Sequence, residues 1–181
     1  MPTILLIRHS RPDFDIRKPV RGDKLVQAVE GYDAACLATI PEPHKKLKIS
    51  AVHASNKQRS IQSASALFPS ATILSSELYR EAELPLKLPR WPTLPFSSWL
   101  VFVRCAWFLG YSQDAENLTQ ARSRAADAAS NLIAFANTNG QAVLVGHGIF
   151  NRLIGSRLRE FGWKNLSHNG SGYDSWQMYQ A

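Results

Sequence analysis

The sequence contains little cysteine and no apolar run long enough to cross a bilayer. Its 181 residues include two cysteines, Cys36 and Cys105. Two thiols so far apart do not form a disulfide framework or a metal-ligand set, so we expect both to be reduced. The first apolar run is interrupted by Arg8 and His9 and is too short for a secretory signal. These absences predict a cytoplasmic protein.

Acidic residues are scarce relative to basic ones. Lysine and arginine total 21 against 14 aspartates and glutamates, which gives a formal net charge of +7. Such a surplus is compatible with nucleic acid, an anionic membrane surface or a phosphorylated substrate as partner. The basic residues are dispersed, however, and only Lys45, Lys46 and Lys48 form a short patch. This dispersion argues against a nucleic-acid-binding protein.

Apolar runs and helical periodicities alternate along the chain. The sequence has no internal repeat or low-complexity tract, and its length fits one domain over residues 1–181. Strands are predicted over 3–7, 48–53, 71–74 and 142–145, with an edge strand at 173–179, and helices over 24–38, 57–68, 116–137 and 149–161. This order predicts an α/β fold with a three-layer α/β/α architecture, in which helices cover both faces of a mostly parallel central sheet.

Two histidines are expected at strand ends. Arg8 and His9 close the first apolar run, and His147 follows the run at 142–145. Open α/β sheets bind their ligands at the carboxyl ends of parallel strands, where loops and helix N-termini meet. Imidazoles with arginines beside them at this edge indicate a phosphoryl-transfer site.

Three sequence blocks, taken in order, resemble a known family. They read Leu6-Ile-Arg8-His9-Ser10, Ala54-Ser55-Asn-Lys-Gln-Arg59-Ser-Ile-Gln62 and Val145-Gly-His147-Gly148. Together they resemble the histidine phosphatase superfamily, also called the phosphoglycerate mutase-like family. The resemblance extends from Thr3 to about Leu158, and it implies a phosphoglycerate mutase-like fold.

The resemblance gives the residues of these blocks their roles. His9 corresponds to the nucleophile that takes the phosphoryl group, and a neutral imidazole suits this role because the phosphoramidate it forms has a labile P–N bond. Arg8 and Arg59, the latter expected in the first turn of its helix, would neutralise the phosphate through their forked guanidinium groups. His147 would complete the pocket by donating a hydrogen bond to the phosphoryl oxygens. This chemistry implies no metal and no other cofactor.

The leaving group needs a proton from an acid. The family places an acidic residue after the third strand, where this sequence offers Glu81 and Glu83. Glu81 lies nearer to the family's position and is favoured, with Glu83 as the alternative. The sequence departs from the family's pattern in two places. Ser10 replaces the commonest glycine after the Arg-His pair, and the Gly-x-Trp-Glu-Gly-like continuation of the acidic block is missing.

Three other polar residues near these blocks have simpler interpretations. His53 falls inside a predicted strand, which favours a structural role. Ser55 precedes a predicted helix without a partner base, so we expect it to be the N-cap of that helix. Arg11 follows the first block closely and could either contact substrate or be a solvated charge.

A proline- and aromatic-rich insertion at about 84–113 replaces the missing continuation. Within it, residues 96–110 are apolar around most of a helix, with Ser97 and Arg104 on one stripe. Three interpretations remain, in order of preference: a core or lid helix that favours a substrate with a hydrophobic body, a homodimer or partner surface, and a membrane-surface helix.

The sequence thus predicts a metal-independent hydrolase of the histidine acid phosphatase type. It would act on a phosphorylated small molecule, a phosphomonoester, through a covalent phosphohistidine on His9. One alternative is a phosphoglycerate mutase-like phosphotransferase, for which the chain is short. Others are a protein phosphohistidine phosphatase and a non-catalytic module that binds phosphate or a partner. The presence of both histidines and both arginines argues against the last.

Overall fold

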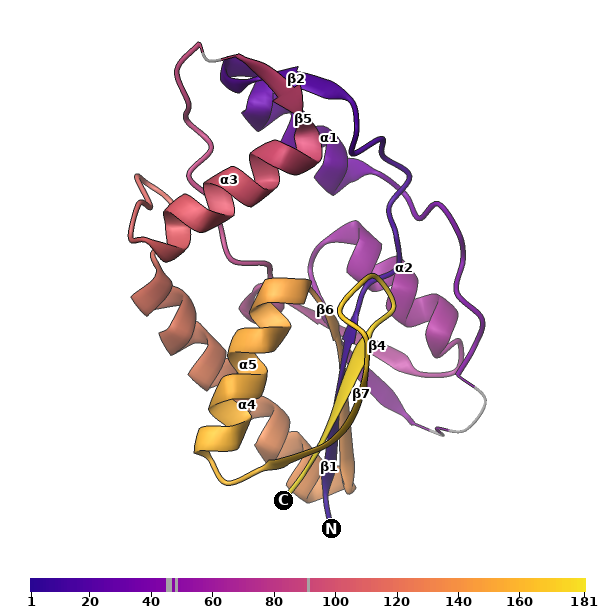
Figure 1. Ribbon diagram of the computed structural model, residues 1–181. Coiled ribbons are helices and arrows are strands. Elements are labelled where there is room, and N and C mark those ends of the chain that lie inside the picture. The colour runs from indigo at the N-terminus through magenta and orange to yellow at the C-terminus, as the bar shows by residue number, and fades with distance from the viewer. Residues whose placement is uncertain (45–46, 48, 91) are drawn as a thin grey trace.

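The fold is described from a computed structural model, which covers residues 1–44, 47, 49–90 and 92–181 (Figure 1). In chain order its elements are β1 (Thr3–Arg8), β2 (Pro19–Arg21), the short 3-10 helix η1 (Gly22–Lys24), α1 (Leu25–Ala34), β3 (Ala51–Ser55), α2 (Gln58–Leu67), β4 (Thr72–Ser76), η2 (Glu77–Tyr79), β5 (Thr93–Pro95), α3 (Phe96–Phe108), α4 (Leu118–Asn139), β6 (Gln141–Gly146), α5 (Gly148–Glu160), β7 (Lys164–Asn169) and β8 (Trp176–Gln180).

Six strands form the central sheet, in the order β4-β3-β6-β1-β8-β7. Strands β4, β3, β6 and β1 run parallel to one another, whereas β8 is antiparallel to β1 and β7 is antiparallel to β8. The prediction of an α/β fold with a mostly parallel sheet is confirmed. The register pairs Arg8 with Gly146, so the residues that follow β1 and β6 emerge side by side.

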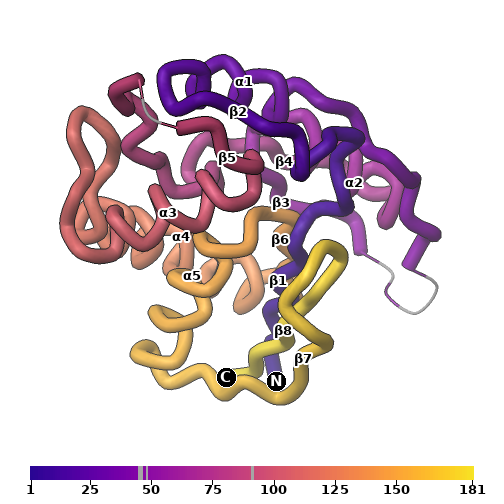
Figure 2. Tube along the Cα trace, turned by 45° about the horizontal axis from the view of Figure 1, so that its top comes forward, coloured from indigo at the N-terminus to yellow at the C-terminus, as the bar shows by residue number. Residues whose placement is uncertain are grey.

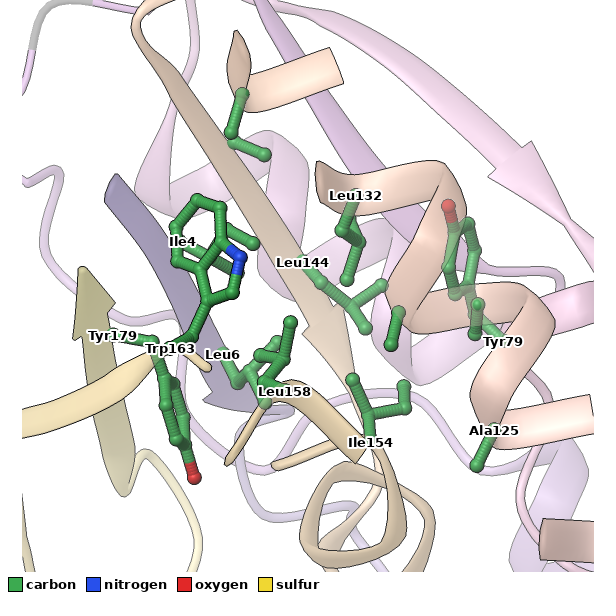
Figure 3. Packing of buried hydrophobic residues seen from close by; sticks show 14 of the residues in the cluster. Ile4, Leu6, Tyr79, Ala125, Leu132, Leu144, Ile154, Leu158, Trp163 and Tyr179 are labelled. Carbon is green, nitrogen blue, oxygen red and sulfur yellow. The ribbon is translucent and has the colours of Figure 1, made fainter. Parts of the chain in front are cut away.

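Side chains of β1 alternate between two apolar cores, because successive residues of a strand point to opposite faces of the sheet. Ile4 and Leu6 pack with Leu144 of β6 against α4 and α5 (Figure 3). Leu5 and Ile7 face the other way, where their cluster includes Ala64 of α2 and Phe68, which follows it. Helices therefore cover both faces, as the three-layer prediction required.

Helix α4 has clear local signals at both ends. Asn117 and Gln120 form a reciprocal capping box with two bonds of 2.9 Å, which satisfies N–H groups that the first turn cannot pair. Gly140 ends the helix in the left-handed conformation at φ 79°. The helix predicted over 116–137 from its apolar spacing is confirmed, and these caps set its ends at Leu118 and Asn139.

The structure corrects several predicted boundaries. Strand β3 begins at Ala51, after Ile49 and Ser50, and the predicted start of this strand at 48 lies outside the described residues. Helix α1 ends at Ala34 because Ala35 adopts an extended conformation. The C-terminal segment forms β8, but it is not an edge strand, because β7 occupies the edge of the sheet beyond it. Strand β7 was not predicted from the sequence. Residues 164–169 of β7 are all exposed and carry no alternating apolar pattern. The basic patch at Lys45, Lys46 and Lys48 lies outside the described residues.

A group of smaller elements lies beyond the carboxyl end of β1. Figure 1 shows α1, α3 and the β2–β5 pair at this end, and Figure 2 shows the β7–β8 turn beside it. Helix α3 is anchored there by the buried aromatic residues Phe96, Trp99 and Trp107. No helix in the described part of the chain is long and apolar enough to cross a membrane.

Candidate active site

All five residues singled out from the sequence line one cavity of about 700 Å³ at the carboxyl edge of the sheet. Arg8 ends β1 and His9 follows it, while His147 follows β6 directly. Arg59 occupies the first turn of α2, as predicted. Glu81 reaches the cavity from the segment after η2, and Glu83 lines it as well. The parallel register of β1 and β6 brings the two histidines together, with their ring centroids 5.1 Å apart.

His9 is held in the tautomer that a nucleophile needs. Its Nδ1 lies 2.7 Å from the carbonyl oxygen of Ser10, and since that oxygen can only accept, Nδ1 carries the proton. The lone pair of Nε2 then faces the cavity, where it accepts a hydrogen bond from Arg59 Nε at 3.1 Å. Burial, followed by the charges of Arg59 and Arg8, lowers the pKa of His9 to about 3. The imidazole is therefore neutral at physiological pH.

His147 is fully buried, with its ring edge-on to that of His9. Its Nε2 lies 2.8 Å from Ser55 Oγ, and its Nδ1 lies 3.5 Å from Arg59 Nη2. Burial, aided by the neighbouring His9 and Arg59, holds the pKa of His147 well below its usual value. Because a guanidinium can only donate, Nδ1 of His147 accepts from Arg59, and Nε2 carries the ring proton and donates it to the Ser55 hydroxyl.

The prediction that Ser55 caps α2 is wrong. The N-cap of α2 is Lys57, and that cap has no side-chain hydrogen bond. Ser55 is instead the last residue of β3, fully buried, where its hydroxyl meets His147. Its place at a strand end turns the side chain inward, toward the neighbouring β6–α5 connection. The residue therefore orients a ring of the site.

Arg59 is fixed by more partners than the sequence indicated. Besides His9, its guanidinium meets Asp33, with Nη1 and Oδ1 2.8 Å apart, and it stacks on the ring of Tyr32 at 4.9 Å. Lys57 also pairs with Asp33 at 2.6 Å. Burial opposes the ionisation of Asp33, but Arg59 and Lys57 outweigh it and hold the pKa of this carboxyl below its usual range. Sequence analysis missed Asp33 and Tyr32, since neither stands in a recognisable motif.

Arg8 is held by the turn between β7 and β8. Its Nη1 donates to the carbonyl oxygen of Ser171 at 3.0 Å, and its guanidinium carbon lies 4.5 Å from the ring centre of Tyr173. The hydroxyl groups of Tyr173 and Tyr32 are 3.1 Å apart, so the rings that stack on the two site arginines are themselves linked. Gly148 allows the approach of Arg8, because a Cβ there would lie 3.2 Å from Nε.

Glu81 lies at the N-terminus of α5, beside His147. Its carboxylate accepts hydrogen bonds from the backbone N–H of Phe150 at 2.9 Å and of Ile149 at 3.4 Å. Glu83, by contrast, turns outward, with a half-exposed side chain paired to Arg80 at 3.4 Å. Of the two glutamates, Glu81 is the one bound to the start of the helix that follows His147, which is in line with the preference for it over Glu83.

Two other residues considered from the sequence lie apart from the cavity. His53 is buried, with Nδ1 3.3 Å from the hydroxyl of Tyr79 and its ring against Phe135, in keeping with a structural role. Arg11 is exposed and does not line the cavity. Among the described residues, no three His, Cys, Asp or Glu side chains are arranged to hold a metal ion.

Helix α3 forms a wall of the cavity. One side of the helix packs inward through the buried residues Phe96, Trp99, Val103 and Trp107. Another lines the cavity through Leu100, Val101, Arg104, Cys105 and Phe108. Helix α3 thus packs into the domain and gives the cavity an apolar wall close to its charged end, while Val101, Phe102 and Phe108 remain exposed.

Comparisons with known proteins give matches among solved structures. No protein-family model and no curated protein matches the sequence. A mycobacterial glucosyl-3-phosphoglycerate phosphatase, solved in complex with VO3, is 18% identical with a TM-score of 0.59, over 98% of this chain and 90% of that one. A phosphoserine phosphatase mutant from Entamoeba histolytica, in complex with phosphoserine, is 14% identical with a TM-score of 0.56, over 98% and 90%. YhfR from Bacillus stearothermophilus is 14% identical with a TM-score of 0.57, over 87% and 80%. At these identities the matches establish the fold.

Proposed function

We propose that this chain, which has the fold of the histidine phosphatase superfamily over nearly its whole length, is a phosphatase that hydrolyses a phosphomonoester through a phosphohistidine on His9. The observation that carries the proposal is the position of His9. Its unprotonated Nε2 faces a cavity in which Arg8, Arg59 and His147 surround the space for one phosphate. The names of two matched proteins, both phosphatases, support the same reaction class.

In the first step, His9 Nε2 attacks phosphorus and the P–O bond to the alcohol breaks. A protonated Glu81 gives its proton to the leaving oxygen, so the alcohol departs neutral. The phosphorylated ring keeps its proton on Nδ1, where the Ser10 carbonyl stabilises the positive charge. In the second step, the Glu81 carboxylate takes a proton from water, which attacks phosphorus and breaks the P–N bond. Phosphate is released and both side chains return to their starting states.

Arg59 has to change partner when substrate binds. In the free protein its Nε–H donates to the lone pair that must attack phosphorus. The phosphoryl oxygens of the substrate take over this hydrogen bond, which frees Nε2 for attack. Asp33 and Tyr32 keep the guanidinium close by during this change, so the transition-state charge meets a donor already in place.

Hydrolysis of phenyl phosphate in the presence of a chelator tests the proposal. We expect turnover that disappears in His9→Ala and in Arg59→Ala and is unchanged in Arg122→Ala, whose exposed residue on α4 does not line the cavity. Wild-type protein quenched in alkali during turnover, which preserves the acid-labile P–N bond, should carry one phosphoryl group by intact mass measured without acid, and His9→Ala should carry none. Turnover by His9→Ala at the wild-type rate would exclude the phosphohistidine. Net transfer of phosphate to another position of a diol substrate would instead identify a mutase.

A further inference from the structure

Two arginines at the wall of the cavity form no salt bridge with the described acidic residues. Arg104 of α3 and Arg152 of α5 both line the cavity. The ion pairs formed by the described residues involve neither of them. Nη1 of Arg104 donates a long hydrogen bond of 3.4 Å to the carbonyl oxygen of Ala82, and the guanidinium lies 5.4 Å from the ring centre of Trp107. Its remaining donors are available to a ligand.

The charge of Arg104 is only partly compensated. Burial lowers the pKa of its guanidinium, and Glu81 is the acid that opposes this effect. The Glu81 carboxylate, however, is already bound to the backbone N–H groups of Phe150 and Ile149. A half-buried guanidinium without a direct counter-ion gains free energy when an anion arrives, since an oxyanion can accept its forked donors in pairs.

Arg104 lies on the leaving-group side of the phosphate pocket. A continuous series of contacts runs from His147 along the start of α5 to Glu81, and from there through Ala82 to Arg104. Glu81 is the residue that protonates the leaving oxygen, so Arg104 stands beyond that oxygen, next to the alcohol part of the substrate. The cavity wall around it is apolar, formed by side chains that include Leu84, Leu86, Leu100, Val101 and Phe108.

We propose that Arg104 binds a carboxylate on the alcohol part of the substrate, with Arg152 as a more exposed second donor. The substrate class is then a phosphomonoester that has an apolar body and carries a carboxylate. This inference rests on the proposed function for the position of the phosphate. The insertion at 84–113 would then select the substrate, and the residues at the strand ends would carry out the reaction.

Binding of two nonhydrolysable ligands tests the inference without requiring turnover. The ligands are para-carboxybenzylphosphonate and para-carbamoylbenzylphosphonate, which differ in charge but little in size. We expect the wild-type protein to bind the carboxylate about tenfold more tightly by calorimetry, the ratio that one charge-assisted hydrogen bond provides. In Arg104→Met, which keeps the length of the side chain, the ratio should fall to about one, while Arg104→Lys should retain part of it.

Arg122→Met is the matched control, because this exposed arginine lies outside the cavity and the ratio should stay at its wild-type value. Unchanged thermal unfolding of Arg104→Met would show that the loss is local. Equal affinities in the wild-type protein, or a ratio that Arg104→Met leaves intact, would overturn the inference. If phenyl phosphate is then still hydrolysed in a His9-dependent way, the proposed function stands alone. Absence of both turnover and phosphonate binding would contradict both proposals.

Discussion

The two ends of the cavity are built in different ways. At the sheet edge, His9, His147 and Arg59 are buried, and each is held by hydrogen bonds to backbone, side chain or neighbouring ring. At the α3 wall, apolar side chains dominate and Arg104 is without an ion-pair partner among the described residues. Preorganised donors suit a transition state whose charge is always in one place, whereas an apolar wall offers contacts that depend on the leaving group.

An arginine-to-lysine substitution should lower kcat/KM much more at the sheet edge than at the α3 wall, and this is the largest expected difference. Arg59→Lys replaces a fork that meets His9, Asp33 and His147 by a single point charge. We expect kcat/KM for phenyl phosphate to fall by about 100-fold or more, the usual cost of losing a preorganised donor. Arg104→Lys should change the same quantity by less than about threefold, because phenyl phosphate has no carboxylate. Similar losses in both variants would remove the distinction between the two ends.

The acid between the two ends should show its role through the leaving group. Glu81→Gln keeps the size of the side chain but has no proton to give. For an alkyl phosphate, whose alcohol leaves poorly, we expect kcat to fall about 100-fold. For nitrophenyl phosphate, which needs no proton, the fall should stay below about tenfold. Glu83→Gln is the comparison, and an equal or larger leaving-group effect there would transfer the acid role to Glu83.

Burial at the sheet edge should make stability depend on pH. Burial, Arg59 and Arg8 lower the pKa of His9 to about 3, whereas the imidazole of an unfolded chain titrates near 6.5. Between these values the unfolded chain binds the proton and the folded chain does not, so stability is lost as pH falls from about 6.5 toward 3. Between pH 7 and pH 5 the loss from His9 amounts to about 2 kcal/mol.

Urea unfolding at pH 7 and at pH 5 measures this loss. The His9→Gln variant should lose about 2 kcal/mol less than the wild type over this interval. His44→Gln, at an exposed position, should keep the full dependence. Identical pH dependences of wild type and His9→Gln would show that His9 is not held neutral by the fold.

The smallest effect is expected at the turn that supports Arg8. Tyr173→Leu removes the ring on which its guanidinium stacks, and a contact of this kind contributes about 0.5–1 kcal/mol. The inhibition constant of inorganic phosphate should then rise about threefold. Tyr173→Phe keeps the ring and loses only the link to the Tyr32 hydroxyl, so its inhibition constant should stay within about twofold of wild type. A larger effect of Tyr173→Phe would mean that the hydroxyl pair, and not the ring, positions Arg8.

Much of the sheet edge could be predicted because its signals are local. Apolar runs fix where β1 and β6 end, and parallel pairing then places the residue after each strand at one edge. His9, His147 and Arg59 follow from this rule together with their motif. The preference for Glu81 over Glu83 came from its position in the motif, and the bonds of Glu81 to the start of α5 are in line with it.

The supporting residues could not be predicted in this way. Asp33 on α1 and Tyr173 in the β7–β8 turn stand in no motif, and they reach the site only through contacts with residues distant in the sequence. Ser55 was given the role of a cap because local sequence favours that role for a serine before a helix. Strand β7 was missed because all of its residues are exposed, so its sequence shows no alternation of apolar and polar residues. It forms a strand through its antiparallel pairing with β8.

The sequence by itself determined the α/β alternation and the strand-end positions of the reactive side chains, because periodicity and motif spacing are properties of neighbouring residues. Only the tertiary structure decided which hydrogen bond fixes the His9 tautomer, which residues hold Arg8 and Arg59, and where α3 lies. Those features depend on how segments far apart in the chain pack together, and close packing brings together side chains whose contacts no single segment specifies.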